Sequence, residues 1–308
     1  IALAEPTAYR ESLKNALSRG LTYPQARSIA LCAAGLKEEE AALIEKPNNL
    51  LGMEYCKALY ALKSPILSVT VKRKGCGYHD QELKREKFAS ASALRKAIAE
   101  QTDASEKHAP LFEEFSEKHA RLFEQLPSVL WSFYRPEACF PLYPDDFSSM
   151  LNYQILLSRG RFSDFSDCSP ELANRLEKQA LSPLSFTERI TSLKTRQYTY
   201  TRISRLLLHI LLDLKQSDVT VGVQNGYIPY LRLLGLRRAS AGLLSEIKKH
   251  TQLPLITKPS AYAPSKNSPA ALFFGQDVFA SNLYYGVLAL KTGFRQKNEM
   301  QRELAVVP

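Results

Sequence analysis

The sequence has no long hydrophobic run. The strongest one, LLLHILLDL at residues 206–214, is interrupted by His209 and Asp213. A helix needs about 20 mainly apolar residues to cross a bilayer. The first 20 residues mix acidic, basic and apolar side chains, so we expect no signal peptide there. The sequence therefore favours a protein that does not have a membrane as its partner.

Cysteine is also scarce. The chain has five cysteines, an odd number, and no pair of them shows the CxxC spacing. This argues against a disulfide framework and against a zinc site. We therefore expect no metal centre and a location in the reducing cytoplasm.

Positive charge is in excess. The chain of 308 residues has a net charge of +10, a pI near 9.3 and 45% hydrophobic residues. The length suggests about two domains, and the composition is that of an ordinary globular protein. The charge fits either an ordinary basic surface or a polyanionic partner such as a nucleic acid, a nucleotide or an anionic membrane. Composition alone does not choose between them.

The pattern of apolar residues divides the chain into two parts. Residues 7–45 read as helices, and residues 48–101 read as helix, strand, loop and helix, with the strand in SPILSVTVKRK. That rhythm is typical of an α/β sheet. After residue 127 the chain reads as amphipathic helices, with LPLITK at 253–258 as an isolated strand. We predict an α/β domain over 1–104 and a mainly helical, all-α domain over 105–308.

A tandem repeat begins the second part. SEKHAPLFEEF is followed at once by SEKHARLFEQL at residues 105–126. The period of eleven is three helical turns. It places His108 and His119 about 16 Å apart along a helix, too far for one metal ion. A duplication that lengthens a surface helix is the better interpretation.

Two polar clusters precede residue 81. Asn48 and Asn49 follow Pro47, where one of them either caps a helix or donates its amide to a ligand. KRKGCGYHD at 72–80 follows the predicted strand, and ligands of open parallel sheets bind beyond strand ends. Arg73 is suited to a two-pronged contact with phosphate. The neighbouring His79 and Asp80 have no nucleophile beside them, so we interpret them as a loop contact.

The third cluster is ASASALRKAI at residues 89–98. Ser90 and Ser92 stand at an expected helix start, and Arg95 lies one turn inside it. Free N–H groups and the helix dipole favour an anion there, and helical side chains lean toward the N-terminus. The pattern fits either a simple serine cap with a solvent-facing arginine or a phosphate cradle.

The three clusters, in this order, resemble a known family. PNNLLGMEYCKAL, VKRKGCGYHD and ASASALRKAI are similar to segments of the bacterial tRNA(Met) cytidine acetate ligases, which are nucleotidyltransferases of the HIGH type. TRQYTYTRISRLLLHILL (195–212) and residues 230–258 resemble the helical C-terminal region of that family. The resemblance implies the C-terminal part of a Rossmann-like nucleotidyltransferase domain, followed by a helical domain that binds tRNA.

The resemblance also implies a reaction. Members of that family use ATP, with Mg²⁺ as its counter-ion, to activate acetate as acetyl-adenylate. They then transfer the acetyl group to the exocyclic amine of the wobble cytidine of elongator tRNA(Met). By position, Asn48, Arg73, Ser90, Ser92 and Arg95 match residues of the ATP site. Acetate and tRNA are the implied partners, and the sequence indicates no particular protein partner.

One motif of the family is missing from the sequence. The family begins with a strand and a His-x-Gly-His-like loop, whereas the five histidines here are isolated and the chain begins with Ile1. We therefore expect that about the first third of a parent protein precedes this chain, and we identify no catalytic residue within it.

Basic residues of the second half suit RNA. Arg202 and Arg205 lie three apart on one helix face, and Arg237 and Arg238 follow later. Lys and Arg contact phosphates, and nearby tyrosines can stack on splayed bases. We predict these four arginines as tRNA contacts; solvated helix faces with packed tyrosines are the alternative.

Three hypotheses follow. The first is the tRNA cytidine acetate ligase reaction. The second is a non-catalytic RNA-binding protein derived from that family, favoured by the absent histidine motif and the charge of +10. The third is an adenylyltransferase acting on a small phosphorylated metabolite, against which the long helical half argues.

Overall fold

The computed structural model describes residues 6–44, 47–71, 88–101, 124–125, 141–195, 197–293 and 295–307. The chain separates into two compact units, residues 1–74 and 75–308, which are taken in turn. The tandem repeat falls almost wholly outside the described residues, as does the loop at 72–87. The expected domain boundary at residues 104 and 105 therefore stays a prediction.

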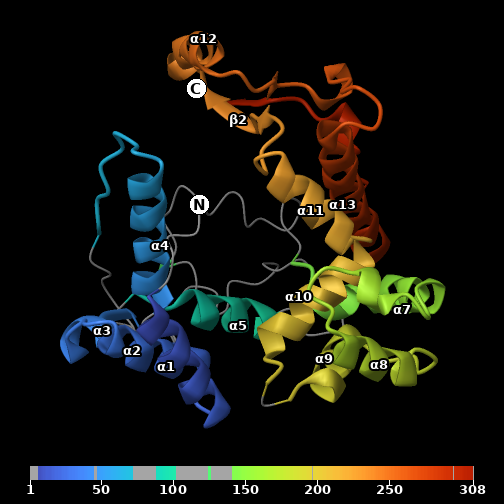
Figure 1. Ribbon diagram of the computed structural model, residues 1–308. Coiled ribbons are helices and arrows are strands. Elements are labelled where there is room, and N and C mark those ends of the chain that lie inside the picture. Colours follow the sequence, from blue (N-terminus) through green and yellow to red (C-terminus); the bar gives the residue numbers. More distant parts are fainter. Residues whose placement is uncertain are drawn as a thin grey trace. The chain divides into compact units, whose positions relative to one another are not determined.

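The first unit is made of helices over the part that the structure describes. Its helices are α1 (Thr7–Ser18), α2 (Tyr23–Ala33), α3 (Glu38–Ile44) and α4 (Pro47–Ala61) (Figure 1). The helices predicted for residues 7–45 are confirmed. α1 packs on α2 through small buried side chains, among them Ala16, Ala26 and Ala30. An ion pair of 3.0 Å between Arg27 and Glu54 joins α2 to α4.

The strand predicted in SPILSVTVKRK does not form in residues 64–71. This stretch pairs with no described strand, and Leu67, Val69 and Val71 are 85–90% exposed. The pattern of β-formers is present, but a strand needs a neighbouring strand for its N–H and C=O groups. No neighbour is available among the described residues, so the sheet of the expected α/β domain is not seen there.

The second unit begins with a helix and continues as a helical bundle. Its first helices are α5 (Ala91–Gln101), η2 (Pro144–Phe147), α7 (Ser148–Leu157), η3 (Phe162–Asp164), α8 (Pro170–Gln179), α9 (Phe186–Leu193), α10 (Tyr200–Leu211) and α11 (Gln216–Gln224). Side-chain caps explain where several of them start. The hydroxyls of Ser169, Ser185 and Thr199 accept N–H bonds from the first turns of α8, α9 and α10.

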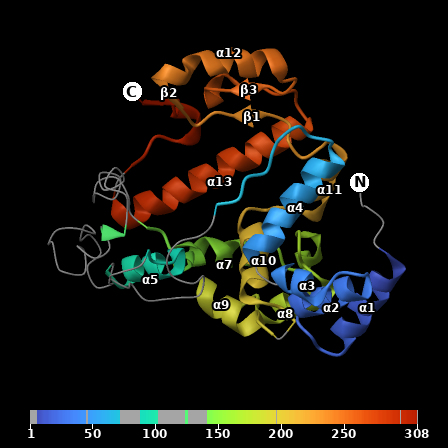
Figure 2. The same cartoon turned by 90° about the vertical axis from the view of Figure 1, so that its left-hand side faces the viewer.

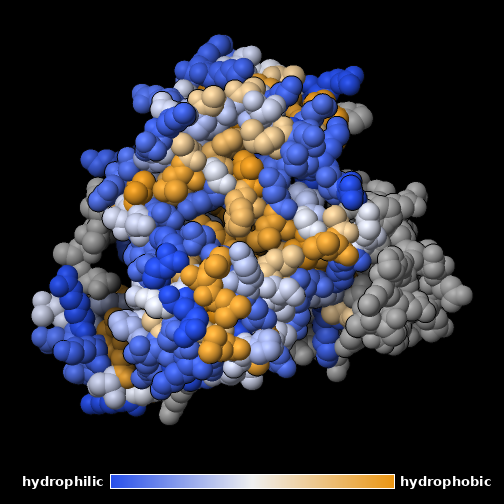
Figure 3. Space-filling model, turned by 90° about the vertical axis from the view of Figure 1, so that its right-hand side faces the viewer, coloured by the Kyte–Doolittle hydropathy of each residue, from blue (hydrophilic) through white to orange (hydrophobic). Residues whose placement is uncertain are grey.

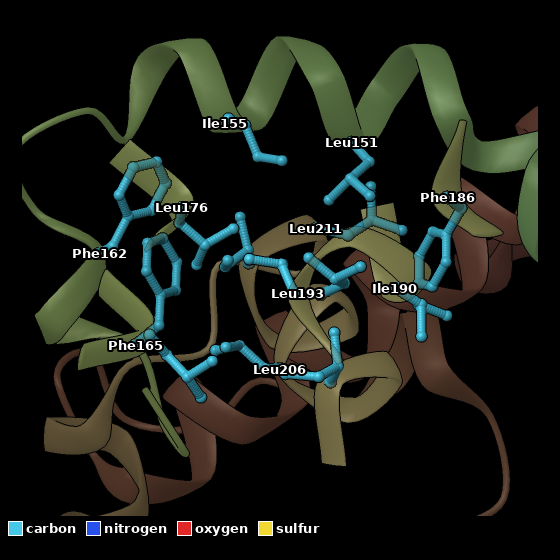
Figure 4. Close-up of a cluster of buried hydrophobic side chains, with 14 of the residues drawn as sticks. Leu151, Ile155, Phe162, Phe165, Leu176, Phe186, Ile190, Leu193, Leu206 and Leu211 are labelled. Atoms are coloured by element: carbon cyan, nitrogen blue, oxygen red, sulfur yellow. The ribbon is translucent and has the colours of Figure 1, made fainter. Parts of the chain in front are cut away.

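The core of this unit lies between α7, α8, α9 and α10. Leu151 and Ile155 point from α7 toward Leu193 and Leu206, and aromatic rings close both sides (Figure 4). The buried cluster is Leu151, Ile155, Phe162, Phe165, Leu172, Leu176, Ala180, Phe186, Ile190, Leu193, Tyr198, Ile203, Leu206, Leu207, Ile210 and Leu211. The helices that the sequence predicts for this region are confirmed, and they supply this core.

The end of the chain is not all-α, which corrects the prediction. Its elements are β1 (Leu231–Arg232), β2 (Gly235–Arg237), η4 (Arg238–Ser240), α12 (Ala241–His250), β3 (Leu255–Ile256), η5 (Pro259–Ala261), α13 (Pro269–Thr292), η6 (Glu299–Gln301) and β4 (Ala305–Val307). β1 pairs with β3 and β2 with β4, both in parallel, and α12 lies beside them (Figure 2). Strands of two or three residues are too short to leave a period-2 pattern, which is why only β3 is predicted.

The long helix α13 is apolar on most of its surface. It has 24 residues, of which only Phe274 and Val287 are buried. Phe279, Tyr284 and Leu290 are exposed. Hydrophobic residues also gather on the face of the molecule shown in Figure 3. Even so, no helix in the described ranges is both long and apolar enough to span a membrane.

The bundle core predicts a large difference between two leucines of α10. Leu206 is fully buried and Leu208 is 42% exposed. Replacing Leu206 by Ala leaves a cavity, so we expect a loss of about 2–5 kcal/mol in the free energy of unfolding. Leu208→Ala removes the same atoms from a half-exposed site and should cost about 1 kcal/mol or less. Urea unfolding followed by circular dichroism measures both; equal losses would contradict this description of the core.

Candidate functional site

The start of α5 is organised around Ser90. Its hydroxyl is buried and accepts the N–H of Ala93 at 3.0 Å, while its carbonyl accepts the N–H of Leu94 at 3.0 Å. Just before it, the N–H of Ala89 donates to the side chain of Gln125 at 2.8 Å. Ser90 is therefore the N-cap of α5, as one of the two interpretations of the sequence requires.

Ser92 and Arg95 complete this helix start. Ser92 is half-buried and Arg95 is exposed. Residues three apart share a helix face, and a helical side chain leans toward the N-terminus, so both belong to the same end of α5. The positive end of the helix dipole lies there as well. Ser90, Ser92 and Arg95 thus all lie within the N-cap and the first turn and a half of α5.

Asn48 occupies a different position from the one expected. α4 begins at Pro47, so Asn48 and Asn49 lie inside its first turn and neither is its cap. Proline is favoured at this first position because its missing N–H is not needed there. Asn49 instead donates its side-chain N–H to the carbonyl of Leu43 at 2.9 Å, at the end of α3. Asn48 is exposed and belongs to the first unit. Arg73, like His79, lies outside the described residues.

Arg202 is packed against an aromatic ring of its own chain. Its guanidinium lies 5.0 Å from the centre of the Tyr198 ring. Tyr198 is buried, and its hydroxyl donates to Glu171 at 2.9 Å and lies 3.0 Å from the hydroxyl of Ser169. The alternative interpretation, in which the tyrosines are packed, therefore describes Tyr198; Tyr200 is 44% exposed.

Arg205 is held by a carboxylate. Its Nε donates to Oδ2 of Asp167 at 2.6 Å. Nδ1 of His209 lies 2.9 Å from the carbonyl of Ser166 and 3.6 Å from Asp167. The hydrogen bond from Arg205, with the charges of Arg205 and Arg202, lowers the pKa of Asp167 despite its partial burial. Sequence reasoning missed Asp167 because this partner lies far from Arg205 along the chain.

Arg237 and Arg238 have a different environment. Arg237 ends β2, opposite Val307 of β4, and Arg238 begins η4. Both side chains are exposed. The four arginines predicted for RNA contact thus divide into two pairs. Arg202 and Arg205 each have a partner on the bundle, although the side chain of Arg205 is 58% exposed, whereas Arg237 and Arg238 lie at the surface beside β2. Among the described residues no group of three or more metal-ligating side chains is found.

The chain and its fold have counterparts in known proteins. A model described as HIGH Nucleotidyl Transferase matches residues 1–301, and the chain belongs to that family. It is 34% identical over 285 residues to a tRNA(Met) cytidine acetate ligase of Caldanaerobacter subterraneus subsp. tengcongensis, covering 92% of this chain and 66% of that protein. A relative of the same name from Halothermothrix orenii is 32% identical over 308 residues, covering 92% of this chain and 67% of that protein.

A solved structure agrees with the fold. The crystal structure of apo Thermotoga maritima TmcAL has a TM-score of 0.74 and 22% identity, covering 98% of this chain and 71% of that one. The resemblance expected from the three clusters is confirmed. The chain spans about two thirds of the length of the curated relatives that it matches.

The Asp167 pair predicts a pH-dependent contribution to stability. A carboxyl whose pKa is lower in the folded state stabilises the fold above its unfolded pKa, about 3.9, and loses that effect as the pH falls through the folded value. Asp167→Asn should therefore cost about 0.2–1 kcal/mol at pH 7, the range for partly exposed pairs, and less near pH 3.

Asparagine is a suitable replacement because it also keeps the backbone conformation at residue 167. Asp167 has a φ of 67°, and asparagine tolerates this region as well as aspartate does. Urea unfolding at pH 7 and pH 3 measures the difference. An equal loss at both values would show that Asp167 acts through its shape and not through its charge.

Proposed function

We propose that this chain takes part in the ATP-dependent acetylation of the wobble cytidine of elongator tRNA(Met). One observation carries the proposal: relatives named tRNA(Met) cytidine acetate ligase are 32–34% identical over 92% of the chain. A structure of Thermotoga maritima TmcAL with bound alpha-thio ATP, at 23% identity, supports ATP as the nucleotide of this fold. Mg²⁺ would accompany ATP as its counter-ion.

The proposed reaction has two steps. A carboxylate oxygen of acetate attacks the α-phosphorus of ATP, which forms acetyl-adenylate and releases pyrophosphate. The exocyclic amine of the cytidine then attacks the acetyl carbonyl, forms the amide and releases AMP. The first step needs a site that binds a polyphosphate, and the second needs a surface that binds RNA.

The start of α5 suits the phosphate part of the first step. Backbone N–H groups at a helix N-terminus and the dipole attract an anion. Ser92 adds a hydroxyl and Arg95 a permanent positive charge on the same face. Asn48 and Arg73 remain part of the proposed ATP site by their match to the family pattern.

The reaction itself is the first test. The protein is incubated with ATP, acetate and elongator tRNA(Met), and pyrophosphate release and acetyl incorporation into the tRNA are measured. We expect acetate-dependent release of pyrophosphate and one acetyl group per tRNA. Binding of tRNA with neither product would instead support the non-catalytic RNA-binding protein. Acetate-independent adenylylation of a small phosphorylated compound would support the third hypothesis.

A variant tests the role of α5 separately. Arg95→Gln keeps a helix-forming polar side chain but removes a charged hydrogen-bond donor, which is worth about 1.5–3 kcal/mol. We expect ATP to bind about 10- to 100-fold more weakly, with unchanged tRNA affinity. Lys96→Gln, one residue later on a different face, is the control and should change ATP binding less than about threefold. Equal effects of both variants would remove Arg95 from the site.

A further inference from the structure

Positive charge is concentrated in one segment near the end of the chain. Residues 231–268 contain seven Lys and Arg residues and a single acidic one, Glu246, which gives a formal charge of +6. The whole chain has +10. By contrast, residues 141–215, which form the bundle, have ten basic and eight acidic residues, or +2 over twice the length. The bundle is thus almost neutral, and the excess charge belongs to the lobe of β1, β2, α12 and β3.

Some of these charges are already neutralised within the lobe. Arg232 forms an ion pair with Glu299, which is 3% exposed and also accepts a hydrogen bond from Ser281 of α13. Lys249 pairs with Glu246 at 2.6 Å. Arg232 and Lys249 are therefore neutralised by carboxylates of the same chain, and we do not count them as contacts for a partner.

Five other cations of this segment are exposed: Arg237, Arg238, Lys248, Lys258 and Lys266. Arg237, Arg238 and Lys248 lie on α12 or just before it, and we call these three the α12 surface. Within the described ranges, no carboxylate lies at ion-pair distance from any of them. Arg205, by contrast, is paired with Asp167, and Arg202 lies over the ring of Tyr198. An exposed cation without an ion pair in the protein can bind a phosphate and release its counter-ions without breaking an interaction of the fold.

The α12 surface is held by regular structure. Arg237 belongs to β2, which pairs with β4, and Arg238 begins η4, the short 3₁₀ turn that leads into α12. Lys248 lies in the last turn of that ten-residue helix, so it is about 15 Å from the two arginines along the helix axis. Successive phosphates of one strand of duplex DNA rise by about 3.4 Å, which sets the scale of spacing along a nucleic-acid backbone. The two ends of α12 therefore match phosphates several nucleotides apart.

We propose that the α12 surface binds the phosphate backbone of RNA, and that Arg202 and Arg205 stabilise the bundle instead of contacting RNA. The identification of that RNA as tRNA(Met) rests on the proposed function; the backbone contact does not. A membrane is the less suitable partner, because Leu243 is the only large apolar side chain of α12 that is exposed. A helix that lies on a membrane needs a wide apolar face.

Salt dependence provides the first measurement. Each phosphate contact lowers the slope of log K against log salt by about 0.7–0.9. For elongator tRNA(Met), the slope of log K against log salt should therefore be about 2–3 units less negative in the triple variant Arg237→Gln, Arg238→Gln, Lys248→Gln. At 0.15 M salt this corresponds to a loss of affinity of about 10- to 100-fold. Fluorescence anisotropy between 0.05 and 0.2 M salt measures both quantities on the protein.

Two controls have related charge changes elsewhere. The triple variant Arg161→Gln, Lys178→Gln, Lys194→Gln removes three exposed cations from the bundle and reaches the same net charge. We expect less than a threefold change in affinity from it, and likewise from Arg202→Gln with Arg205→Gln. A loss as large as that of the α12 triple variant in either control would overturn the proposal. Circular dichroism verifies that all variants are folded.

The remaining outcomes separate this proposal from the proposed function. If the α12 triple variant acetylates tRNA(Met) with an unchanged KM, the α12 surface is wrong and the function stands. If the protein acetylates no tRNA but loses RNA affinity in this variant, the surface stands and the function is wrong. If the variant keeps RNA affinity and instead loses binding to vesicles of phosphatidylserine and phosphatidylcholine, the surface binds membranes and the proposal fails.

Discussion

The bundle depends on one buried positive charge. The side chain of Arg189 in α9 is fully buried, and its guanidinium donates to the carbonyls of Gln179 and Ser182 and to the side chain of Asn152, at 2.7–3.1 Å. It thereby satisfies the end of α8, the turn that follows and a polar group of α7. Burial without a carboxylate partner lowers the pKa of Arg189. The free energy of removing this charge from water is offset only while all three acceptors stay in place.

This constraint explains why the bundle is a stable support for neighbouring elements. Because Arg189 needs acceptors from α7, α8 and the turn after α8, those segments cannot move apart without exposing a desolvated charge. A second buried charge acts in the same way at the other end of the unit, where Glu299 receives Arg232 and Ser281. Each of these two buried charges, Arg189 and Glu299, binds partners from separate segments of the chain. The second of these charges joins β1 to η6 and α13, within the part of the chain that also carries the exposed cations of β2 and α12.

Local signals explain what the sequence predicts well. The helix beginning at ASASALRKAI, and those that follow Ser169, Ser185 and Thr199, start at capping side chains a few residues from the amides they bind. Non-local partners explain what it does not predict. Residues 64–71 have the composition of a strand, but no strand lies beside them in the described part of the chain. Likewise, the position of Arg205 depends on Asp167, 38 residues away. The prediction that Asn48 or Asn49 caps α4 fails for a local reason. Pro47 suits the first position of a helix better than the end of the preceding one, so the helix already begins there.

The two pairs of arginines show why residue type alone is a weak guide to RNA contact. In the sequence, Arg202 and Arg205 have the better pattern, since they share a helix face with tyrosines before them. In the folded chain, however, Arg202 contacts the ring of Tyr198 and Arg205 forms an ion pair with Asp167. Arg237 and Arg238 have no helical pattern, yet they stand exposed where acidic side chains are fewest. A cation contributes to binding a polyanion in proportion to the counter-ions it can release, and a cation already paired inside the protein releases few. The partners of each charge therefore decide which basic residues serve the fold and which serve RNA.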